Sequence, residues 1–429
     1  MEYILKYSSI LLIGFLLCKT AYDAFAVCFP DRGRALSFVS FPDLSFSFAF
    51  WRSFFHSPYV HVTSMVLVNR VILIVFASLV YSFLEGRPID VIGNFDDVWY
   101  KWDTRHFLYI AEHGYPRFGE LKTILVYYPM YPFLVKGANL AFDNYFVSAI
   151  FVSFVFLILA CIYLYKLALL EFGDKVVAKD SVKYLLLFPL SLFASMAYTE
   201  STFIAFSICC FYYIRRQLWF VAGVFGMLAA ITRNQGILLF APFVYEAVRV
   251  TIEQKRLSGQ LPLWGCITRF SSPLLILCGF GAYLAVNKGV SGDWFQFLEY
   301  QKVNWGQEAM FFADNIANIY NRVGNGSSMM AMGTWIPSVS VFIFCLGMML
   351  CMTRVLPTAY IIYSVLFFVV SYSPSWLISG ARYMFALFPM YMVLARLVSG
   401  KRQMAQYVDT IFLFYTMIIC MAFIKHNVY

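Results

Sequence analysis

Long apolar segments separated by short polar connections dominate the sequence. Each is typical of an α-helix that crosses a membrane, because about 20 apolar residues span the hydrocarbon core of a bilayer. Some segments are shorter, and we expect those helices to extend into their connections or to be tilted. The candidate spans cover residues 64–84, 146–170, 184–198, 200–214, 217–232, 235–250, 269–287, 333–352, 356–372, 383–397 and 408–425. The pattern predicts an all-α polytopic membrane protein with about 11 to 12 transmembrane helices.

Lysine and arginine residues set the direction of these predicted spans. If the span at 64–84 crosses outward, the basic connections fall together on the cytoplasmic side, namely Lys175 to Lys183, Arg215-Arg216, Lys255-Arg256, Arg354 and Lys401-Arg402. This orientation obeys the positive-inside rule, and the opposite one violates it at each of these connections. The apolar stretch 121–141 must then remain on the outer side. Prolines 129 and 132 would interrupt a helix there, so we expect an interfacial segment with amphipathic helices in the first outer loop.

The same topology gathers polar side chains on the extracytoplasmic side. The polar stretch from Lys101 to Tyr115, which contains Asp103, lies there, together with a long loop at about 288–332. Three short turns join them: Tyr198-Thr199-Glu200-Ser201, Thr232-Arg233-Asn234-Gln235-Gly236 and Ser379-Gly380-Ala381-Arg382-Tyr383. Charged residues between apolar helices are costly in a membrane, so we interpret their convergence as a candidate active site.

Composition supports a membrane protein and argues against several other classes. Hydrophobic residues make up 61% of the chain and charged residues 13%, with a mean hydropathy of +0.72. The formal net charge of +9 is scattered over the connections, so we expect no nucleic-acid partner. The ten cysteines lack C-x-x-C spacing and the five histidines lack metal-ligand spacing. A Gly-rich phosphate loop and a nucleophile elbow are also missing, and we expect neither a metal nor a cofactor.

Each candidate in the outer turns also has a structural explanation. Asp103 precedes an amphipathic stretch and could simply cap its helix. Glu200 requires a cationic partner such as Arg233 or Arg382, and a purely structural ion pair would satisfy it. Both arginines could instead extend to the membrane interface. Residues on the helix after Asp103 could be solvated side chains without a ligand, namely Arg105, His106, Glu112 and His113.

Several motifs, in order, resemble the GPI mannosyltransferase 2 family. Trp102-Asp103, His106-Phe107 and Ile110-Ala111-Glu112-His113-Gly114-Tyr115 resemble the first outer loop of that family, and Tyr128-Pro129-Met130-Tyr131-Pro132 resembles its aromatic-proline segment. The resemblance continues through 188–193, 198–201, 232–236, Gly292-Asp293-Trp294 with Gln301 and Trp305, and Arg382-Tyr383 near Phe388-Pro389. It covers roughly residues 64 to 397, and the compact loops are more similar to the bacterial members.

The resemblance implies a GT-C type bundle and a membrane glycosyltransferase. Such an enzyme moves a sugar, which we expect to be mannose, from a polyprenyl-phosphate donor to a lipid or glycan acceptor on the extracytoplasmic face. The family's proposed base is an aspartate early in the first outer loop, and Asp103 is the matching position. One carboxylate acting on the acceptor predicts inversion at the anomeric carbon, because double displacement needs a second carboxylate as nucleophile.

The chemistry assigns roles to the other outer residues. Arg233 and Arg382 are candidate partners of the donor phosphate, because guanidinium groups match phosphate oxygens. Glu200 would orient an arginine or bind sugar hydroxyls. The remaining candidates for substrate binding are Trp102, Arg105, His106, Glu112, His113, Tyr198, Asn234 and Tyr383.

The alternative function is a polytopic transporter or flippase of a charged or lipid-linked solute. The absence of a visible internal repeat and the position of the charges at one membrane edge favour the enzyme. We expect residues 1–60 to form an N-terminal segment of unknown role, a candidate for an extra membrane helix, and 61–429 to form the catalytic domain. The expected location is the bacterial cytoplasmic membrane with the site outside, or the endoplasmic reticulum membrane with a lumenal site if the source is eukaryotic.

Overall fold

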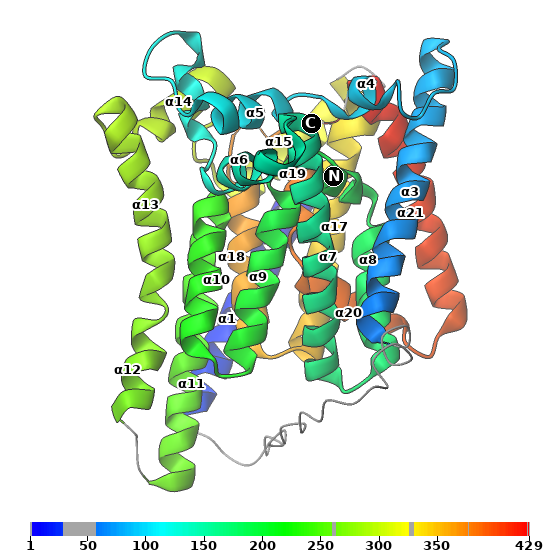
Figure 1. Cartoon of the computed structure of the whole chain (residues 1–429). Helices are drawn as coiled ribbons and strands as arrows, with labels where there is room; N and C mark the ends of the chain where they lie inside the picture. The colour runs from blue at the N-terminus through cyan, green and yellow to red at the C-terminus, as the bar shows by residue number, and fades with distance from the viewer. Residues whose placement is uncertain are drawn as a thin grey trace, which may run out of the picture.

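The computed structural model describes residues 2–28, 57–259, 263–325, 330–375, 377–426 and 428. Within these ranges the chain is almost entirely helical, and an isolated β-bridge joins Ala309 to Pro374. Long helices run side by side, and shorter ones gather at one end of the bundle (Figure 1). The predicted all-α fold is therefore confirmed.

Several helices meet the requirements for a membrane span. Six helical segments of the described residues are long and apolar enough to cross: Pro58–Glu85 (α3), Tyr145–Phe172 (α7), Asn234–Ser258 (η3 and α11), Leu263–Ser291 (α12 and α13), Ala331–Val355 (η4 and α17) and Arg402–Ile424 (α21). A bent pair, η2 (Pro189–Ser195) with α9 (Glu200–Arg215), raises the number to seven if it forms one span. Shorter apolar helices of the described residues are the Ile4–Leu17 part of the N-terminal helix, α10 (Trp219–Thr232), α18 (Thr358–Tyr372) and α20 (Pro389–Val398). The chain is a multi-pass membrane protein, and the count of 11 to 12 crossings stays a prediction.

Two predicted spans are wrong as continuous helices. The segment 184–198 is interrupted, because α8 (Lys175–Leu187) ends before Pro189 and the chain then bends by 102° between η2 and α9. The segment 383–397 is interrupted between α19 (Gly380–Met384) and α20, which begins at Pro389. Proline lacks an N–H donor and disfavours helical backbone in the preceding residue, so each proline starts a new helix instead of continuing the old one.

The short helices define one end of the bundle, which we call the loop end. It carries α4 (Phe95–Trp99), α5 (Thr104–His113), η1 (Glu120–Val126), α6 (Met130–Phe142), α14 (Gln296–Trp305), α15 (Phe312–Asn325) and α19 (Figure 1). The predicted amphipathic helix is confirmed in α5, which buries Phe107, Ile110 and Ala111 and exposes Glu112 and His113. The stretch 121–141 falls in η1 and α6, and α6 packs against α5 and α7.

The N-terminal helix α1 (Glu2–Cys28) packs against α15 and α18, and Lys6 forms an ion pair with Asp314 of α15. Residues 29–56 of the predicted N-terminal segment lie outside the described residues.

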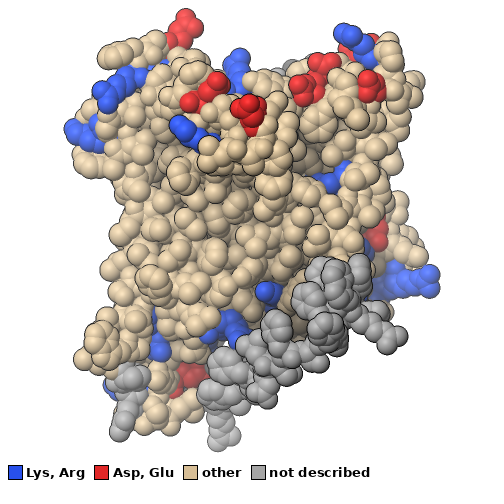
Figure 2. All heavy atoms as spheres, in the orientation of Figure 1, with Lys and Arg blue, Asp and Glu red and all other residues tan. Residues whose placement is uncertain are grey.

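The opposite end of the bundle, which we call the basic end, carries the C-terminal ends of α7, α9, α11, α17 and α20 (Figure 1). On the face drawn in Figure 2, charged side chains lie mostly toward the two ends and leave a largely uncharged band between them. Near the basic end, Arg215 of α9 contacts Glu171 of α7 at 2.6 Å and Glu246 of α11 at 3.2 Å. Tyr360 of α18 donates a hydrogen bond to Glu171 at 2.9 Å. This network joins four helices at the end away from the short loop helices.

Glycines allow α10 and α13 to approach each other closely. A Cβ atom added at Gly279 of α13 would lie 2.5 Å from the carbonyl oxygen of Met227 in α10, and one at Gly223 of α10 would lie 2.4 Å from the carbonyl oxygen of Ser272. Small residues at a helix contact let backbones pack together, which supplies van der Waals contact where lipid offers no hydrophobic driving force.

We predict that Gly279→Leu lowers the stability of the protein by on the order of 1–3 kcal/mol, because the added side chain must push α10 and α13 apart. The matched control is Gly281→Leu on the same helix, where an added Cβ meets nothing within 4 Å. Thermal unfolding of the two purified variants in detergent measures the difference. Equal midpoints for both variants would contradict the proposed close packing.

Candidate functional site

A cavity of about 880 Å³ opens between the helices at the loop end. Its walls come from α5, the connection between η1 and α6, the turn before α9, the start of η3, α14, the end of α18, and α19. Most of the residues singled out in the sequence line it: Trp102, Asp103, Arg105, His106, Tyr198, Glu200, Arg233, Asn234, Arg382 and Tyr383. Segments more than a hundred residues apart therefore meet in one chamber.

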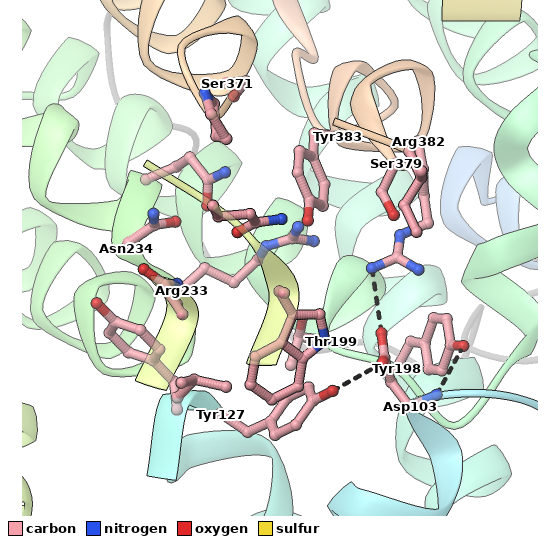
Figure 3. A pocket seen from close by; sticks show the side chains of 18 of the residues that line it. Asp103, Tyr127, Tyr198, Thr199, Arg233, Asn234, Ser371, Ser379, Arg382 and Tyr383 are labelled. Carbon is pink, nitrogen blue, oxygen red and sulfur yellow. Dashed lines mark hydrogen bonds and ion pairs between the residues drawn. The ribbon is translucent and has the colours of Figure 1, made fainter. Parts of the chain in front are cut away.

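The carboxylate of Asp103 points into this cavity (Figure 3). Its Oδ1 accepts a hydrogen bond of 2.7 Å from the hydroxyl of Tyr127, and its Oδ2 lies 3.4 Å from Nη2 of Arg382. Asp103 occupies the N-cap position of α5, but its side chain makes no capping hydrogen bond. The capping explanation of this residue is therefore wrong, and the carboxylate remains directed toward the cavity.

Tyr127 stays in its protonated form and donates its hydrogen bond to the Asp103 carboxylate. Burial raises the pKa of the Tyr127 hydroxyl well above its usual range, and the nearby charge of Asp103 raises it further. The ring of Tyr127 stacks on that of His106 with centroids 5.3 Å apart. Burial lowers the pKa of His106, which is therefore neutral near pH 7. Arg105 donates to Nε2 of His106 at 3.4 Å, as a neutral ring with an acceptor nitrogen allows.

The backbone before Asp103 is fixed by the end of α21. Trp102 has a φ of +46°, a left-handed conformation that is unusual for a bulky residue. Its ring packs against Phe423, with centroids 5.2 Å apart. The buried ammonium of Lys101 donates to the carbonyl oxygens of Phe423 and Ile424 at 3.3 and 3.0 Å. These contacts hold a strained residue in place directly before the carboxylate.

Glu200, at the start of α9, lies between two arginines. One oxygen, Oε1, is 3.0 Å from Nη1 of Arg233 and 3.0 Å from Nε of Arg382, and the glutamate is only 1% exposed. Neither contact has the geometry of a hydrogen bond, so the attraction is mainly between charges. Burial lowers the pKa of Arg382, but Glu200 and Asp103 outweigh that effect and the net pKa is raised. The predicted partnership of Glu200 with these arginines is confirmed.

Aromatic rings surround both guanidinium groups. Arg382 lies over the rings of Tyr198 and Phe193 at 4.9 and 5.2 Å, and Arg233 lies over that of Tyr383 at 5.0 Å. Figure 3 shows Tyr383 near both arginines. Rings of this kind stabilise a cation that has lost much of its water, and the side chains of Arg233 and Arg382 are only 11% and 9% exposed.

Two predicted substrate-binding residues lie outside the cavity. Glu112 and His113 are exposed, absent from its lining, and contact each other at 3.7 Å. The ring of His113 stacks on Tyr109 at 4.8 Å. Both residues lie on the solvent side of α5, because the opposite side packs against the bundle.

Sequence reasoning missed several residues of the cavity. Tyr127 has no predicted role, and its contact with Asp103 spans 24 residues. Gln301, Trp305, Gln235 and Ser371 also line the cavity. Gln235, Gln301 and Trp305 belong to motifs of the family resemblance without an assigned role, and their place in the cavity, like that of Ser371, depends on how the helices pack. Within the described ranges, no group of three or more His, Cys, Asp or Glu could hold a metal ion, and the expectation of a metal-free site stays a prediction.

Comparison with known proteins gives limited matches. No family model matches the chain. Over 148 residues it is 26% identical to GPI alpha-1,6-mannosyltransferase 2 of Cricetulus griseus, which covers 32% of this chain and 29% of that protein. Because the match spans less than a third of the mannosyltransferase, the activity and substrates of that protein can be assigned to this chain only as a proposal.

Two solved structures are similar at a low level. An oligosaccharyltransferase of Archaeoglobus fulgidus, tethered with an acceptor peptide, has a TM-score of 0.47 and 11% identity, covering 87% of this chain and 56% of its own. ArnT from Cupriavidus metallidurans, bound to undecaprenyl phosphate, has a TM-score of 0.47 and 13% identity, covering 85% of this chain and 76% of its own. These likenesses do not place the chain in a family.

We predict that Glu200→Gln destabilises the protein by about 3–5 kcal/mol, because Arg233 then loses its carboxylate partner and Arg382 keeps only Asp103. The double variant Glu200→Gln/Arg233→Met should recover part of this loss, since it removes one uncompensated charge. Thermal unfolding in detergent measures both effects. The exposed Glu299→Gln serves as a control, and a Glu200→Gln midpoint as high as that of the control would contradict the electrostatic role of Glu200.

Proposed function

We propose that this protein is a membrane glycosyltransferase of the GT-C type. It transfers a sugar, mannose in our proposal, from a polyprenyl-phosphate donor to a lipid or glycan acceptor on the extracytoplasmic face. The observation that carries the proposal is the Asp103 carboxylate, directed into a cavity at one end of a membrane bundle with an arginine 3.4 Å away. The partial match to a mannosyltransferase supports the choice of reaction.

Asp103 acts as the general base in this proposal. The acceptor hydroxyl gives its proton to the carboxylate while its oxygen attacks the anomeric carbon, and the bond between that carbon and the phosphate oxygen breaks. Polyprenyl phosphate leaves with the electron pair. Oδ1 accepts a hydrogen bond of 2.7 Å from Tyr127, whereas the contact of Oδ2 with Arg382 is longer, at 3.4 Å, so Oδ2 is the oxygen more available for the proton. Attack from the face opposite the phosphate inverts the anomeric centre.

The charge balance of the cavity suits a singly charged phosphodiester. Its lining contains four cationic side chains, Arg105, Arg233, Lys302 and Arg382, and three anionic ones, Asp103, Glu200 and Glu308. Lys302 and Glu308 pair with each other at 2.7 Å, and Glu200 and Asp103 offset the two inner arginines. The excess positive charge corresponds to Arg105, which has no carboxylate partner among the described residues.

In this scheme Arg233 and Arg382 direct free N–H groups toward the departing phosphate, and Arg105 supplies the additional charge. Preorganised cations stabilise the negative charge that develops on the leaving group. Trp102, His106, Tyr198, Asn234 and Tyr383 shape the space around the reacting sugar. Glu112 and His113 have no role in this mechanism.

A transporter or flippase is the competing proposal. A transporter would need polar groups along a path through the bundle, because ionisable residues inside the membrane line the substrate pathway of such proteins. The cavity that holds the convergent charges lies instead at the loop end, which favours chemistry there over passage through the bundle.

The base assignment predicts that Asp103→Asn lowers the rate of transfer by roughly 10²- to 10⁴-fold, because the amide cannot accept the proton. Transfer from polyprenyl-phosphomannose by the purified variant measures the loss. Asp96→Asn is the matched control, since Asp96 is an exposed carboxylate of the same loop that does not line the cavity. Near-normal transfer by a folded Asp103→Asn protein would exclude the role of this residue as base.

The proposed sidedness predicts the labelling of introduced cysteines in intact cells. Val303→Cys at the loop end should react with a membrane-impermeant thiol reagent from outside, whereas Leu257→Cys at the basic end should react only after permeabilisation. Both positions are well exposed, at 72% and 75%, so access to the thiol does not limit the reaction. The reverse labelling pattern would place the cavity on the cytoplasmic side.

A further inference from the structure

Three neutral polar side chains that line the cavity each have a polar atom without a hydrogen-bond partner among the described residues. They are Tyr128, Gln235 and Ser371, which are 7%, 4% and 1% exposed. The Tyr128 hydroxyl, Oε1 of Gln235 and Oγ of Ser371 are buried and have no hydrogen-bond partner among the described residues. A buried polar group without a partner lowers stability, because it loses its hydrogen bonds to water and gains none in return. These groups therefore require an explanation.

The neutral groups differ from the charged residues of the same cavity. Glu200, Arg233 and Arg382 balance one another through contacts of 3.0 Å, and Asp103 is held by Tyr127. Glu200 and the two inner arginines thus have partners of opposite charge, whereas the amide oxygen of Gln235 and the hydroxyl of Ser371 have no partner among the described residues.

The fold places Gln235 and Ser371 on two elements in contact. Gln235 belongs to η3 and Ser371 to the last turn of α18, and these two elements pack against each other. A Cβ atom added at Gly236 would lie 2.3 Å from the carbonyl oxygen of Ala229, so this glycine lets η3 fold closely onto α10 beside Gln235. In Figure 3, Ser371 and Asn234 lie on the side of the cavity away from Asp103 and Tyr198.

We infer that Gln235 and Ser371, with Asn234 beside them, form a subsite that binds the hydroxyl groups of a neutral sugar ring. Amide and hydroxyl groups can each donate and accept a hydrogen bond, and so can sugar hydroxyls. A phosphate only accepts, so it would leave the oxygen of Gln235 without a donor. The inference rests on the proposed function for the identity of the ligand, and the sugar belongs to either the donor or the acceptor.

Binding measurements test this subsite without requiring turnover. Polyprenyl-phosphomannose, polyprenyl phosphate and octyl mannoside are titrated into the purified protein, the last of these after saturation with polyprenyl phosphate. Gln235→Leu and Ser371→Ala should each weaken binding of a mannose-bearing probe roughly 3- to 10-fold, the effect of one lost hydrogen bond, and leave polyprenyl phosphate binding unchanged. An effect on polyprenyl-phosphomannose assigns the subsite to the donor sugar, and an effect confined to octyl mannoside assigns it to the acceptor.

Thermal unfolding of the ligand-free protein supplies a second readout. Removing an unpartnered buried polar group should leave the midpoint unchanged or raise it, so both variants should fold at least as well as the parent while binding sugar more weakly. Thr202→Val is the matched control, because the Thr202 hydroxyl is also buried without a partner but does not line the cavity. This control should keep the affinity for every probe.

The outcomes separate the subsite from the transferase. Unchanged binding of both mannose-bearing probes by Gln235→Leu and Ser371→Ala, or equal weakening of polyprenyl phosphate, would overturn the subsite. If the variants bind a mannose-bearing probe selectively more weakly and the parent protein catalyses no transfer, the subsite proposal stands and the transferase proposal fails. Should Gln235→Leu fail to fold, Ser371→Ala alone decides, since it removes one oxygen and adds no bulk.

Discussion

The contact of one buried carboxylate with two arginines organises the loop end of this protein. Glu200 begins α9, Arg233 joins α10 to η3, and Arg382 belongs to α19, so their contacts of 3.0 Å join three turns from distant parts of the sequence. Removing one member of such a buried group leaves the charge of another member uncompensated. The resulting loss of stability is larger than the net contribution of the intact ion pair. Arg382 also lies 3.4 Å from Asp103, so the same charged group reaches the carboxylate that we propose as the base.

A second constraint orients Asp103 from the opposite side. Lys101 binds the carbonyl groups at the end of α21, and Trp102 adopts a left-handed backbone against Phe423. Strain of this kind persists where surrounding contacts enforce it, and it is common at functional sites. The C-terminal helix thus sets the direction of a carboxylate more than three hundred residues earlier. Tyr127 completes the arrangement by donating to Oδ1 of Asp103, while Oδ2 has the longer contact with Arg382.

The sequence predicts the charged part of this site better than its neutral part. The cost of charge in a membrane indicates that Glu200 needs Arg233 or Arg382, and the structure has both contacts. Hydropathy also identifies the apolar segments, but it does not register the helix breaks at Pro189 and Pro389. Glu112 and His113 belong to the right helix and face the wrong side, since family motifs do not state which face is buried. The contact of Tyr127 with Asp103 and the unpartnered Gln235 depend on tertiary packing, which no local pattern encodes.

A structure of the protein with polyprenyl phosphate and a bound sugar acceptor tests the central claim most directly. The account predicts the phosphate beside Arg233 and Arg382, and an acceptor hydroxyl within hydrogen-bonding distance of the Asp103 carboxylate, at about 2.6–3.2 Å. A lipid phosphate bound outside the cavity, or an acceptor whose hydroxyl groups all lie beyond the reach of Asp103, would contradict it.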